Sequence, residues 1–195
     1  MRSSSAVGIF FLALLPCANA IAQEDADHDH HQPASGMPII DEIRVDFELL
    51  DADGALVTDE SFRGKFVLLA FGFTHCETVC PIMAFTMAQA LASTNENAVG
   101  IFVSVDTERD SPASTHRYAA AFDERMIGLG GDYARINAVT GNFNVSYAVT
   151  KTRDSYVVQH TANIFLIDPA GELREVFSVN ATPDNIVEAI LARGE

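Results

Sequence analysis

Two long apolar runs predict the centre of a β-sheet. Lys65–Phe73 (KFVLLAFGF) and Val99–Val105 (VGIFVSV) are almost continuously apolar. Such runs are typical of strands that are buried on both faces. Shorter runs, separated by turn residues such as Asp53-Gly54, predict further strands at Val45–Leu50, Ala55–Thr58, Tyr156–Val158, Ala162–Ile167 and Glu172–Val179.

Helical spacing and capping residues predict four helices. Pro81 suits the first turn of a helix that continues to about Asn95, with Met83, Met87 and Leu91 on one apolar stripe. This stripe indicates that the two methionines pack in the core and do not bind metal. Capping residues predict three more helices, at Ser111-Pro112 to Phe122, Asp132 to Phe143 and Thr182-Pro183 to Arg193.

The order of these elements predicts an α/β domain with a thioredoxin-like fold. A strand hairpin comes first, strands and helices then alternate, and an antiparallel pair and a closing helix come last. A buried strand that leads into a cysteine-bearing loop and a helix fits this fold. We therefore expect a central mixed sheet flanked by helices, an N-terminal β-hairpin, and one domain over residues 41–195.

Residues 1–22 have the pattern of a signal peptide. Arg2 supplies the positive start, Val7–Leu15 is a short apolar run, and Ala18–Ala20 and Ala20–Ala22 are small-x-small cleavage sites. The apolar run is far shorter than the roughly 20 residues of a membrane span. We expect cleavage and export to the periplasm, where thiols can oxidise. A lipid anchor at Cys17, or an uncleaved N-terminus, is the alternative.

Residues 23–40 are predicted to be a disordered linker, because they are densely charged and lack apolar periodicity. His28, His30 and His31 alternate there with aspartates. The segment is either a solvated acidic linker or an auxiliary site that captures Cu(II) weakly. If it captures Cu(II), removing residues 24–32 should lower total Cu(II) uptake.

Composition narrows the function classes. The 195 residues are 48% hydrophobic and 20% charged, and the formal net charge is −15. So acidic a surface repels nucleic acid, and no Lys/Arg cluster offsets it. We therefore exclude nucleic-acid binding.

The candidate chemistry lies in Phe71–Pro81 (FGFTHCETVCP). Cys76 falls in the loop after a predicted central strand, and Cys80 falls at the start of the next helix. In an oxidising compartment such a pair is a disulfide by default. The N-terminus of a helix also favours thiolates, which both redox exchange and metal binding require. Two thiolates select soft cations such as Cu(I), and a neutral imidazole is a compatible third ligand.

Three histidines of the predicted domain are candidates for that imidazole. His75 adjoins Cys76, and we expect its side chain to point away from the cysteine pair. His116 is expected on a polar helix face. His160 comes just before a predicted strand whose start lies opposite the cysteine loop in thioredoxin-like folds. Thioredoxins have a cis-proline there, whereas this chain has no proline between Pro112 and Pro169.

Three ordered motifs make the chain resemble the SCO/SenC family, thioredoxin-like copper chaperones for cytochrome c oxidase assembly. The motifs are Phe71–Cys76 with Val79–Pro81, Ser104–Asp106 with Glu108–Pro112, and His160-Thr161 with Leu166–Pro169 and Gly171. The resemblance implies that Cys76, Cys80 and His160 bind copper, as Cu(I) or Cu(II). Two positions depart from the family pattern: Gln159 replaces an aspartate that many members have, and Thr107 replaces a common proline.

The resemblance implies a metallochaperone, which is not an enzyme, with a copper-accepting oxidase subunit as its partner. Other periplasmic copper carriers or thiol reductants are further candidate partners. The alternative is a dedicated thiol-disulfide reductase that uses Cys76 and Cys80 to keep the oxidase cysteines reduced. A thiol peroxidase is disfavoured, because the threonine expected three residues before the attacking cysteine is absent. Asp106, Arg109 and Asp110 are interpreted as loop pairing and capping residues.

Overall fold

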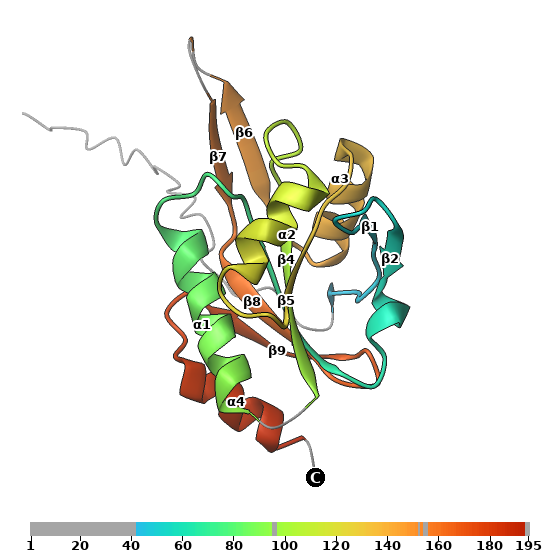
Figure 1. Ribbon diagram of the computed structural model, residues 1–195, viewed down its shortest axis with the longest axis vertical. Helices are drawn as coiled ribbons and strands as arrows, with labels where there is room; N and C mark the ends of the chain where they lie inside the picture. The colour runs from blue at the N-terminus through green and yellow to red at the C-terminus, as the bar shows by residue number, and fades with distance from the viewer. Residues whose placement is uncertain (1–41, 95–96, 152, 154–155, 194–195) are drawn as a thin grey trace, which may run out of the picture. The chain divides into compact units, whose positions relative to one another are not determined.

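The computed structural model describes residues 42–94, 97–151, 153 and 156–193 (Figure 1). The predicted signal peptide and His/Asp-rich linker lie outside these residues. Among the helices of the described part, none is both long enough and apolar enough to cross a membrane.

A five-stranded mixed sheet forms the centre of the fold, with the strand order β5-β4-β3-β8-β9 (Figure 1). The strand β3 pairs in parallel with β4, and β4 pairs in parallel with β5. The strand β8 pairs antiparallel with both β3 and β9. The strands are β3 (Phe66–Gly72), β4 (Ala98–Ser104), β5 (Met126–Leu129), β8 (Asn163–Ile167) and β9 (Leu173–Ser178).

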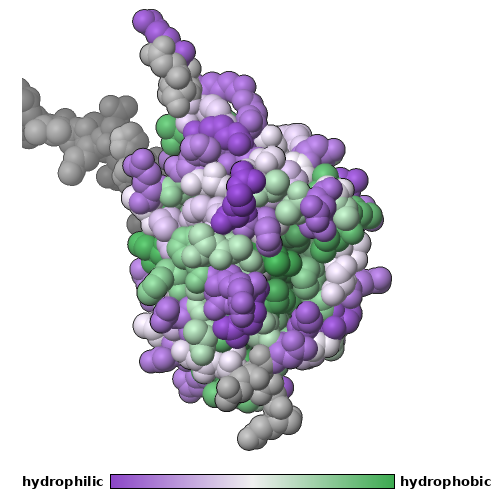
Figure 2. Space-filling view, in the orientation of Figure 1, coloured by the Kyte–Doolittle hydropathy of each residue, from purple (hydrophilic) through white to green (hydrophobic). Residues whose placement is uncertain are grey.

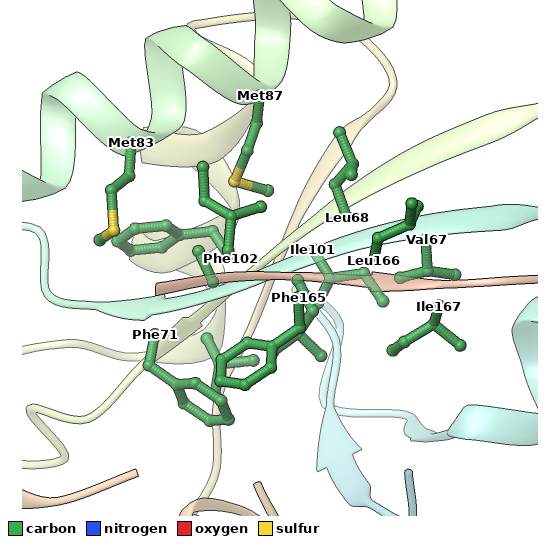
Figure 3. Close-up of a cluster of buried hydrophobic side chains, with 14 of the residues drawn as sticks. Val67, Leu68, Phe71, Met83, Met87, Ile101, Phe102, Phe165, Leu166 and Ile167 are labelled. Carbon is green, nitrogen blue, oxygen red and sulfur yellow. The ribbon is translucent and has the colours of Figure 1, made fainter. Parts of the chain in front are cut away.

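The two long apolar runs are the central strands of this sheet. Every residue of β3 and β4 is buried, which confirms the prediction of strands covered on both faces. Met83 and Met87 point from the first helix onto one face, beside Phe102 (Figure 3). Phe71 and Phe165 lie on the opposite face, with their ring centroids 6.1 Å apart. Both methionines are fully buried, so their predicted place in the core is confirmed.

In the described part of the chain, four α-helices flank the sheet, as predicted. Ser111 accepts a hydrogen bond from the Ser114 backbone N–H, and Asp132 and Thr182 cap their helices in the same way. The first helix begins at Val79, so Cys80 lies in its first turn, as expected. The helices are α1 (Val79–Ser93), α2 (Pro112–Ala120), α3 (Tyr133–Asn142) and α4 (Pro183–Leu191), and a short 3-10 helix, η2, spans Asp59–Phe62.

Two β-hairpins lie outside the central sheet. The predicted N-terminal hairpin is present but shorter, with β1 (Glu48–Leu50) paired to β2 (Leu56–Thr58). A second hairpin joins β6 (Tyr147–Lys151) to β7 (Tyr156–His160). The sequence analysis missed β6, because most of its residues are exposed and no apolar alternation marks it. It also missed β5, a strand of four residues with a glycine inside.

The predicted thioredoxin-like arrangement, a mixed sheet flanked by helices with an N-terminal hairpin, is therefore confirmed. On the face drawn in Figure 2, hydrophilic and hydrophobic residues are interspersed over the surface. The candidate site lies where β3 leads into α1 and where β7 ends beside that junction.

Candidate metal centre

The cysteine loop connects the end of β3 to the start of α1. The Cys80 backbone N–H donates a hydrogen bond to Cys76 Sγ over 3.4 Å, so Cys76 caps the N-terminal end of the helix with its sulfur. Cys76 is partly exposed, whereas Cys80 is fully buried. Both thiols are free in this structure. The default expectation of a structural disulfide therefore does not describe this state.

The two thiols have opposite acidities. Burial by itself would raise the pKa of Cys76, but hydrogen bonds from the Cys80 side chain and from the backbone at the start of α1 outweigh it and lower that pKa. Deeper burial raises the pKa of Cys80, and its hydrogen bond with Cys76 adds to this effect. Cys76 is therefore the sulfur that ionises first.

His160 comes from a distant part of the chain and reaches the same pair. Its Nε2 lies 3.4 Å from Cys80 Sγ, and its Nδ1 lies 2.9 Å from the Thr161 carbonyl oxygen. Because a carbonyl only accepts hydrogen bonds, Nδ1 carries the proton and Nε2 offers a lone pair toward the sulfur. Burial lowers the pKa of His160, which favours the neutral ring. The ring packs at right angles to Phe73, with the centroids 5.9 Å apart.

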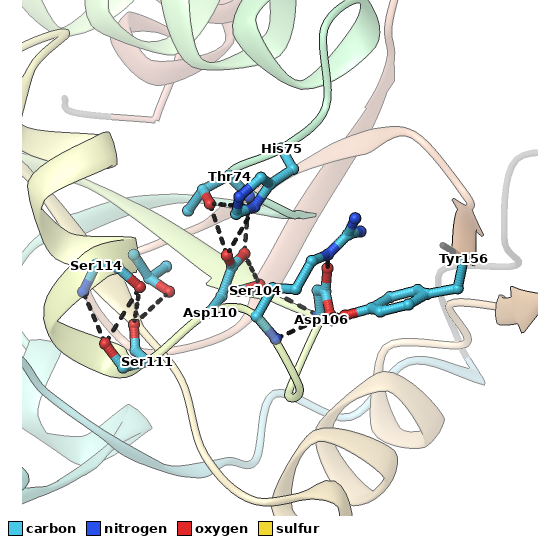
Figure 4. Close-up of polar contacts among 10 residues, drawn as sticks. Thr74, His75, Ser104, Asp106, Asp110, Ser111, Ser114 and Tyr156 are labelled. Atoms are coloured by element: carbon cyan, nitrogen blue, oxygen red, sulfur yellow. Dashed lines mark hydrogen bonds and ion pairs between the residues drawn. The ribbon is translucent and has the colours of Figure 1, made fainter. Parts of the chain in front are cut away.

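The other candidate histidines have different roles. His75 Nδ1 lies 3.1 Å from Thr74 Oγ1 and 3.5 Å from Asp110 Oδ1, and its side chain is exposed (Figure 4). That nitrogen is thus directed at the Asp110 network, while His75 lines the same pocket as Cys76. Its expected orientation away from the cysteines stays a prediction. His116 Nδ1 accepts a hydrogen bond from the Gly128 backbone N–H and joins α2 to β5. His28, His30 and His31 lie outside the described residues.

A buried carboxylate holds the beginning of the cysteine loop. Asp110 accepts hydrogen bonds from the Thr74 backbone N–H at 2.8 Å, from Thr74 Oγ1 at 2.6 Å and from Ser104 Oγ at 2.6 Å (Figure 4). Charge-assisted hydrogen bonds to a buried carboxylate are among the stronger ones in proteins. Asp106 pairs with Arg109 in the same loop. The interpretation of these acidic residues as loop pairing groups is confirmed.

The sequence analysis assigned no role beside His160 to three residues that surround it. Phe73 packs on the His160 ring, Tyr156 donates a hydrogen bond to Asp106, and the Arg109 guanidinium lies over the Tyr156 ring. The Gln159 side chain, where the sequence departs from the family pattern, is exposed and lines the same pocket as Cys76 and His160. For Tyr156 the only signal in the sequence is its position four residues before His160, which places both side chains on one face of a strand.

An open pocket of about 550 Å³ gives access to the site, and its lining includes Cys76, His160, Arg109 and Tyr156. Two sulfurs and one imidazole nitrogen thus converge beside a solvent-facing hollow. Among the residues that the structure describes, no group of three or more His, Cys, Asp or Glu side chains is already arranged to hold a metal ion. The donors themselves, two thiols and a neutral imidazole, match a soft cation such as Cu(I).

Comparisons with known proteins show which proteins this chain is similar to. The SCO1/SenC family model matches residues 38–193. Protein sco1 of Schizosaccharomyces pombe is 37% identical over 153 residues, which cover 74% of this chain and 58% of that protein. The chain spans about half the length of the curated relatives that it matches first.

Solved structures are similar as well. ScoI of Bradyrhizobium japonicum, solved with copper bound, is 37% identical with a TM-score of 0.68, and the match covers 75% of this chain and 96% of that one. BsSco, a member of the Sco family of cytochrome c oxidase assembly proteins in which a disulfide switch was identified, is 29% identical with a TM-score of 0.59. That match covers 75% of this chain and 91% of BsSco.

Proposed function

Because this chain belongs to the SCO1/SenC family, we propose that it is an exported metallochaperone that binds copper and delivers it to cytochrome c oxidase during assembly. The proposed ligands are Cys76 Sγ, Cys80 Sγ and His160 Nε2. The observation that carries the proposal is the approach of His160 Nε2 to within 3.4 Å of Cys80 Sγ. The copper in the solved ScoI of Bradyrhizobium japonicum supports the choice of metal.

The two oxidation states of copper would depend on the ligands differently. Thiolates are soft ligands and favour Cu(I), whereas imidazole also suits the harder Cu(II). Because copper binds the thiolate form, the buried Cys80 thiol must lose its proton when the metal enters. Cys76 already has a lowered pKa and loses its proton more readily. Copper uptake is therefore expected to release protons and to weaken at low pH.

The proposed transfer uses the open side of the site. Cys76 and His160 both line the pocket, whereas Cys80 is fully buried beneath it. An acceptor with its own sulfur or nitrogen ligands can approach the exposed pair and replace these ligands one at a time. Cys80 would be the last to release the ion. Export to the periplasm and auxiliary Cu(II) capture by His28, His30 and His31 both stay predictions.

A second candidate function is dedicated thiol-disulfide reduction, favoured by the unequal thiols. The Cys76 thiolate would attack a partner disulfide and form a mixed disulfide, with one partner sulfur leaving as a thiolate. Cys80, after losing its proton, would then attack Cys76 Sγ. This step releases the reduced partner and leaves a Cys76–Cys80 disulfide. The disulfide switch of BsSco supports this redox state. All peptide bonds of the described residues are trans, so the cis-proline of thioredoxins has no counterpart here.

Copper analysis of the reduced protein tests the first proposal. The wild type is compared with Cys76→Ser, Cys80→Ser and His160→Ala, and His75→Ala is the matched histidine control. We expect one copper per chain in the wild type and no tight binding after either cysteine substitution. His160→Ala should weaken Cu(II) far more than Cu(I), and His75→Ala should change neither. If His160→Ala binds Cu(II) as the wild type does, the three-ligand site is wrong and the reductase function takes precedence.

Delivery needs a separate measurement. Protein loaded with Cu(I) is mixed with the reduced soluble copper domain of an oxidase subunit, and the copper content of each is measured after separation. Transfer supports the chaperone. In a second arm, the metal-free reduced protein is mixed with the same domain carrying its cysteines as a disulfide. If that disulfide is reduced while no copper moves in the first arm, the thiol-disulfide reductase is the correct function.

A further inference from the structure

His160 lies on a strand, β7, that is not part of the central sheet. Among the described residues, the strand β7 pairs with β6 alone, in a two-stranded sheet (Figure 1). The cysteines, in contrast, follow the central strand β3 directly. The pairing of β8 with β3 brings the end of β7 near the cysteine loop, but its register stops at Ile164, four residues after His160. Side-chain contacts of the hairpin therefore also orient His160 toward Cys80.

The residues of β7 alternate between two sides of the hairpin. Val158 is buried, whereas Val157 and Gln159 are exposed. Because successive side chains of a strand point to opposite faces, Tyr156 and His160 share the inward face with Val158. A contact that fixes Tyr156 therefore also fixes the rotation of β7 about its own axis. That rotation sets the direction in which the His160 side chain points.

A compact polar contact holds Tyr156. Its hydroxyl donates a hydrogen bond to Asp106 Oδ1 over 2.5 Å, and Arg109 Nε donates one to Asp106 Oδ2 over 2.5 Å (Figure 4). The Arg109 guanidinium carbon lies 4.1 Å from the Tyr156 ring centroid. The Asp106 side chain is only 1% exposed, so solvent screens these contacts little.

The same arginine connects this contact with the packing of His160. The Arg109 guanidinium carbon also lies 5.8 Å from the Phe73 ring centroid, and Phe73 packs on the His160 ring. The guanidinium thus touches both the anchor of the hairpin and the aromatic wall of the site. The only ion pair that the structure gives between the hairpin and this loop, Lys151 with Glu108, is solvent-exposed, and exposed pairs contribute little.

We propose that Asp106, Arg109 and Tyr156 form a positioning cluster that holds the β6–β7 hairpin so that His160 can reach the copper. The inference rests on the proposed function, and it adds residues that do not touch the metal. The cluster should matter most for binding of Cu(II), the oxidation state that depends more on the imidazole of His160. Loosening the cluster therefore weakens Cu(II) binding more than Cu(I) binding.

The test uses the full chain and the substitution Tyr156→Phe, which removes the hydroxyl and keeps the ring over Arg109. The matched control is Tyr147→Phe. Tyr147 is the partner of His160 in the β6–β7 register, and its hydroxyl interacts with Tyr133, which does not belong to the cluster. Affinities for Cu(II) and Cu(I) are measured by competition with chelators, the Cu(II) absorption spectrum is recorded, and thermal unfolding of the metal-free protein checks the fold.

We expect Tyr156→Phe to weaken Cu(II) binding about tenfold, the effect of losing one hydrogen bond to a charged group, and to change Cu(I) binding less than about threefold. The sulfur-to-Cu(II) absorption band should shift as well. Tyr147→Phe should leave both affinities and the band unchanged. Arg109→Gln, which keeps the Tyr156–Asp106 hydrogen bond and removes the cation, should cause the same selective loss and serves as a second variant if Tyr156→Phe folds poorly.

A double variant decides whether the cluster acts through His160. In the His160→Ala background, Tyr156→Phe should cause no further loss of Cu(II) affinity. A further loss there, an equal loss for Cu(I) and Cu(II), or an effect equal to that of Tyr147→Phe would overturn the inference. The proposed function fails by a different result, in which His160→Ala alone leaves Cu(II) binding unchanged.

Discussion

Gly72 ends β3 at a place where the chain has no space for a side chain. A Cβ atom at this position would lie 2.5 Å from Phe102 Cζ and 3.0 Å from Cys80 Sγ, whereas ordinary van der Waals contacts begin at 3.4 Å. The backbone does not require glycine, because Gly72 is not among the residues with positive φ. The substitution Gly72→Ala therefore tests close packing alone, directly beneath the proposed metal site.

The cost follows from the surroundings of Phe102. This ring is fully buried and packs on Tyr118 with the centroids 5.0 Å apart, so it has little freedom to move away. Overpacking of a core typically costs about 1–3 kcal/mol. Replacing glycine by alanine also lowers the conformational entropy of the unfolded chain, which offsets about 0.4–1 kcal/mol of this loss of stability. We expect a net loss of about 1–2 kcal/mol, which for this chain length lowers the melting temperature by roughly 2–8 °C.

The assay is thermal and urea unfolding of the reduced, metal-free protein, with Gly141→Ala as the matched control. A Cβ atom at Gly141, inside α3, would meet no heavy atom within 4 Å. That substitution should stabilise the protein by about 0.5–1 kcal/mol, because alanine favours a helix over glycine. The two identical chemical changes thus have opposite signs. If Gly72→Ala is as stable as the wild type, the close approach of β3, Phe102 and Cys80 is not a constraint on the fold.

Two further predictions follow from pKa shifts. Cys76 should react with iodoacetamide well before Cys80, because the pKa of Cys76 is lowered while burial raises that of Cys80. The reaction rate of Cys76 should also fall less than that of a free thiol between about pH 8 and about pH 6. Equal labelling of both cysteines in peptide mass spectrometry would contradict this. Burial would raise the pKa of Asp168, but hydrogen bonds from the Glu172 backbone and Arg174 lower it below 3.8. Its stabilisation is therefore present above that pH and is lost as the pH falls. Wild type should exceed Asp168→Asn in unfolding free energy by about 1–3 kcal/mol at neutral pH, with the difference shrinking below about pH 4; a difference that is constant with pH would refute the assignment.

Local patterns were sufficient for most of the fold. The apolar runs predicted β3 and β4, because a strand covered on both faces has no polar side. Ser111, Asp132 and Thr182 predicted helix starts, because their side chains satisfy backbone N–H groups within three residues. Cys76 and Cys80 were likewise predictable as a pair beside a helix N-terminus. In each case the physical cause lies within a few residues of the chain.

The third member of the site needed more than local pattern. Cys80 and His160 are 80 residues apart, and they meet because β8 pairs with β3 and brings the end of β7 beside the cysteine loop. Motif resemblance indicated His160, but residue spacing alone left His75 and His116 open. The hydrogen bonds that distinguish the three rings come from different elements in each case.

Only the tertiary structure identified the contacts around the site. Nothing near Tyr156 in the sequence indicates that its hydroxyl reaches Asp106, which is 50 residues away. Strands β5 and β6 are equally invisible, because one is very short and the other is mostly exposed. Periodicity records which side of an element is buried, but it does not record which other element covers that side. The covering element is determined when the sheet assembles. Its assembly brings an imidazole, a tyrosine and an arginine to two thiols that are already neighbours in the sequence.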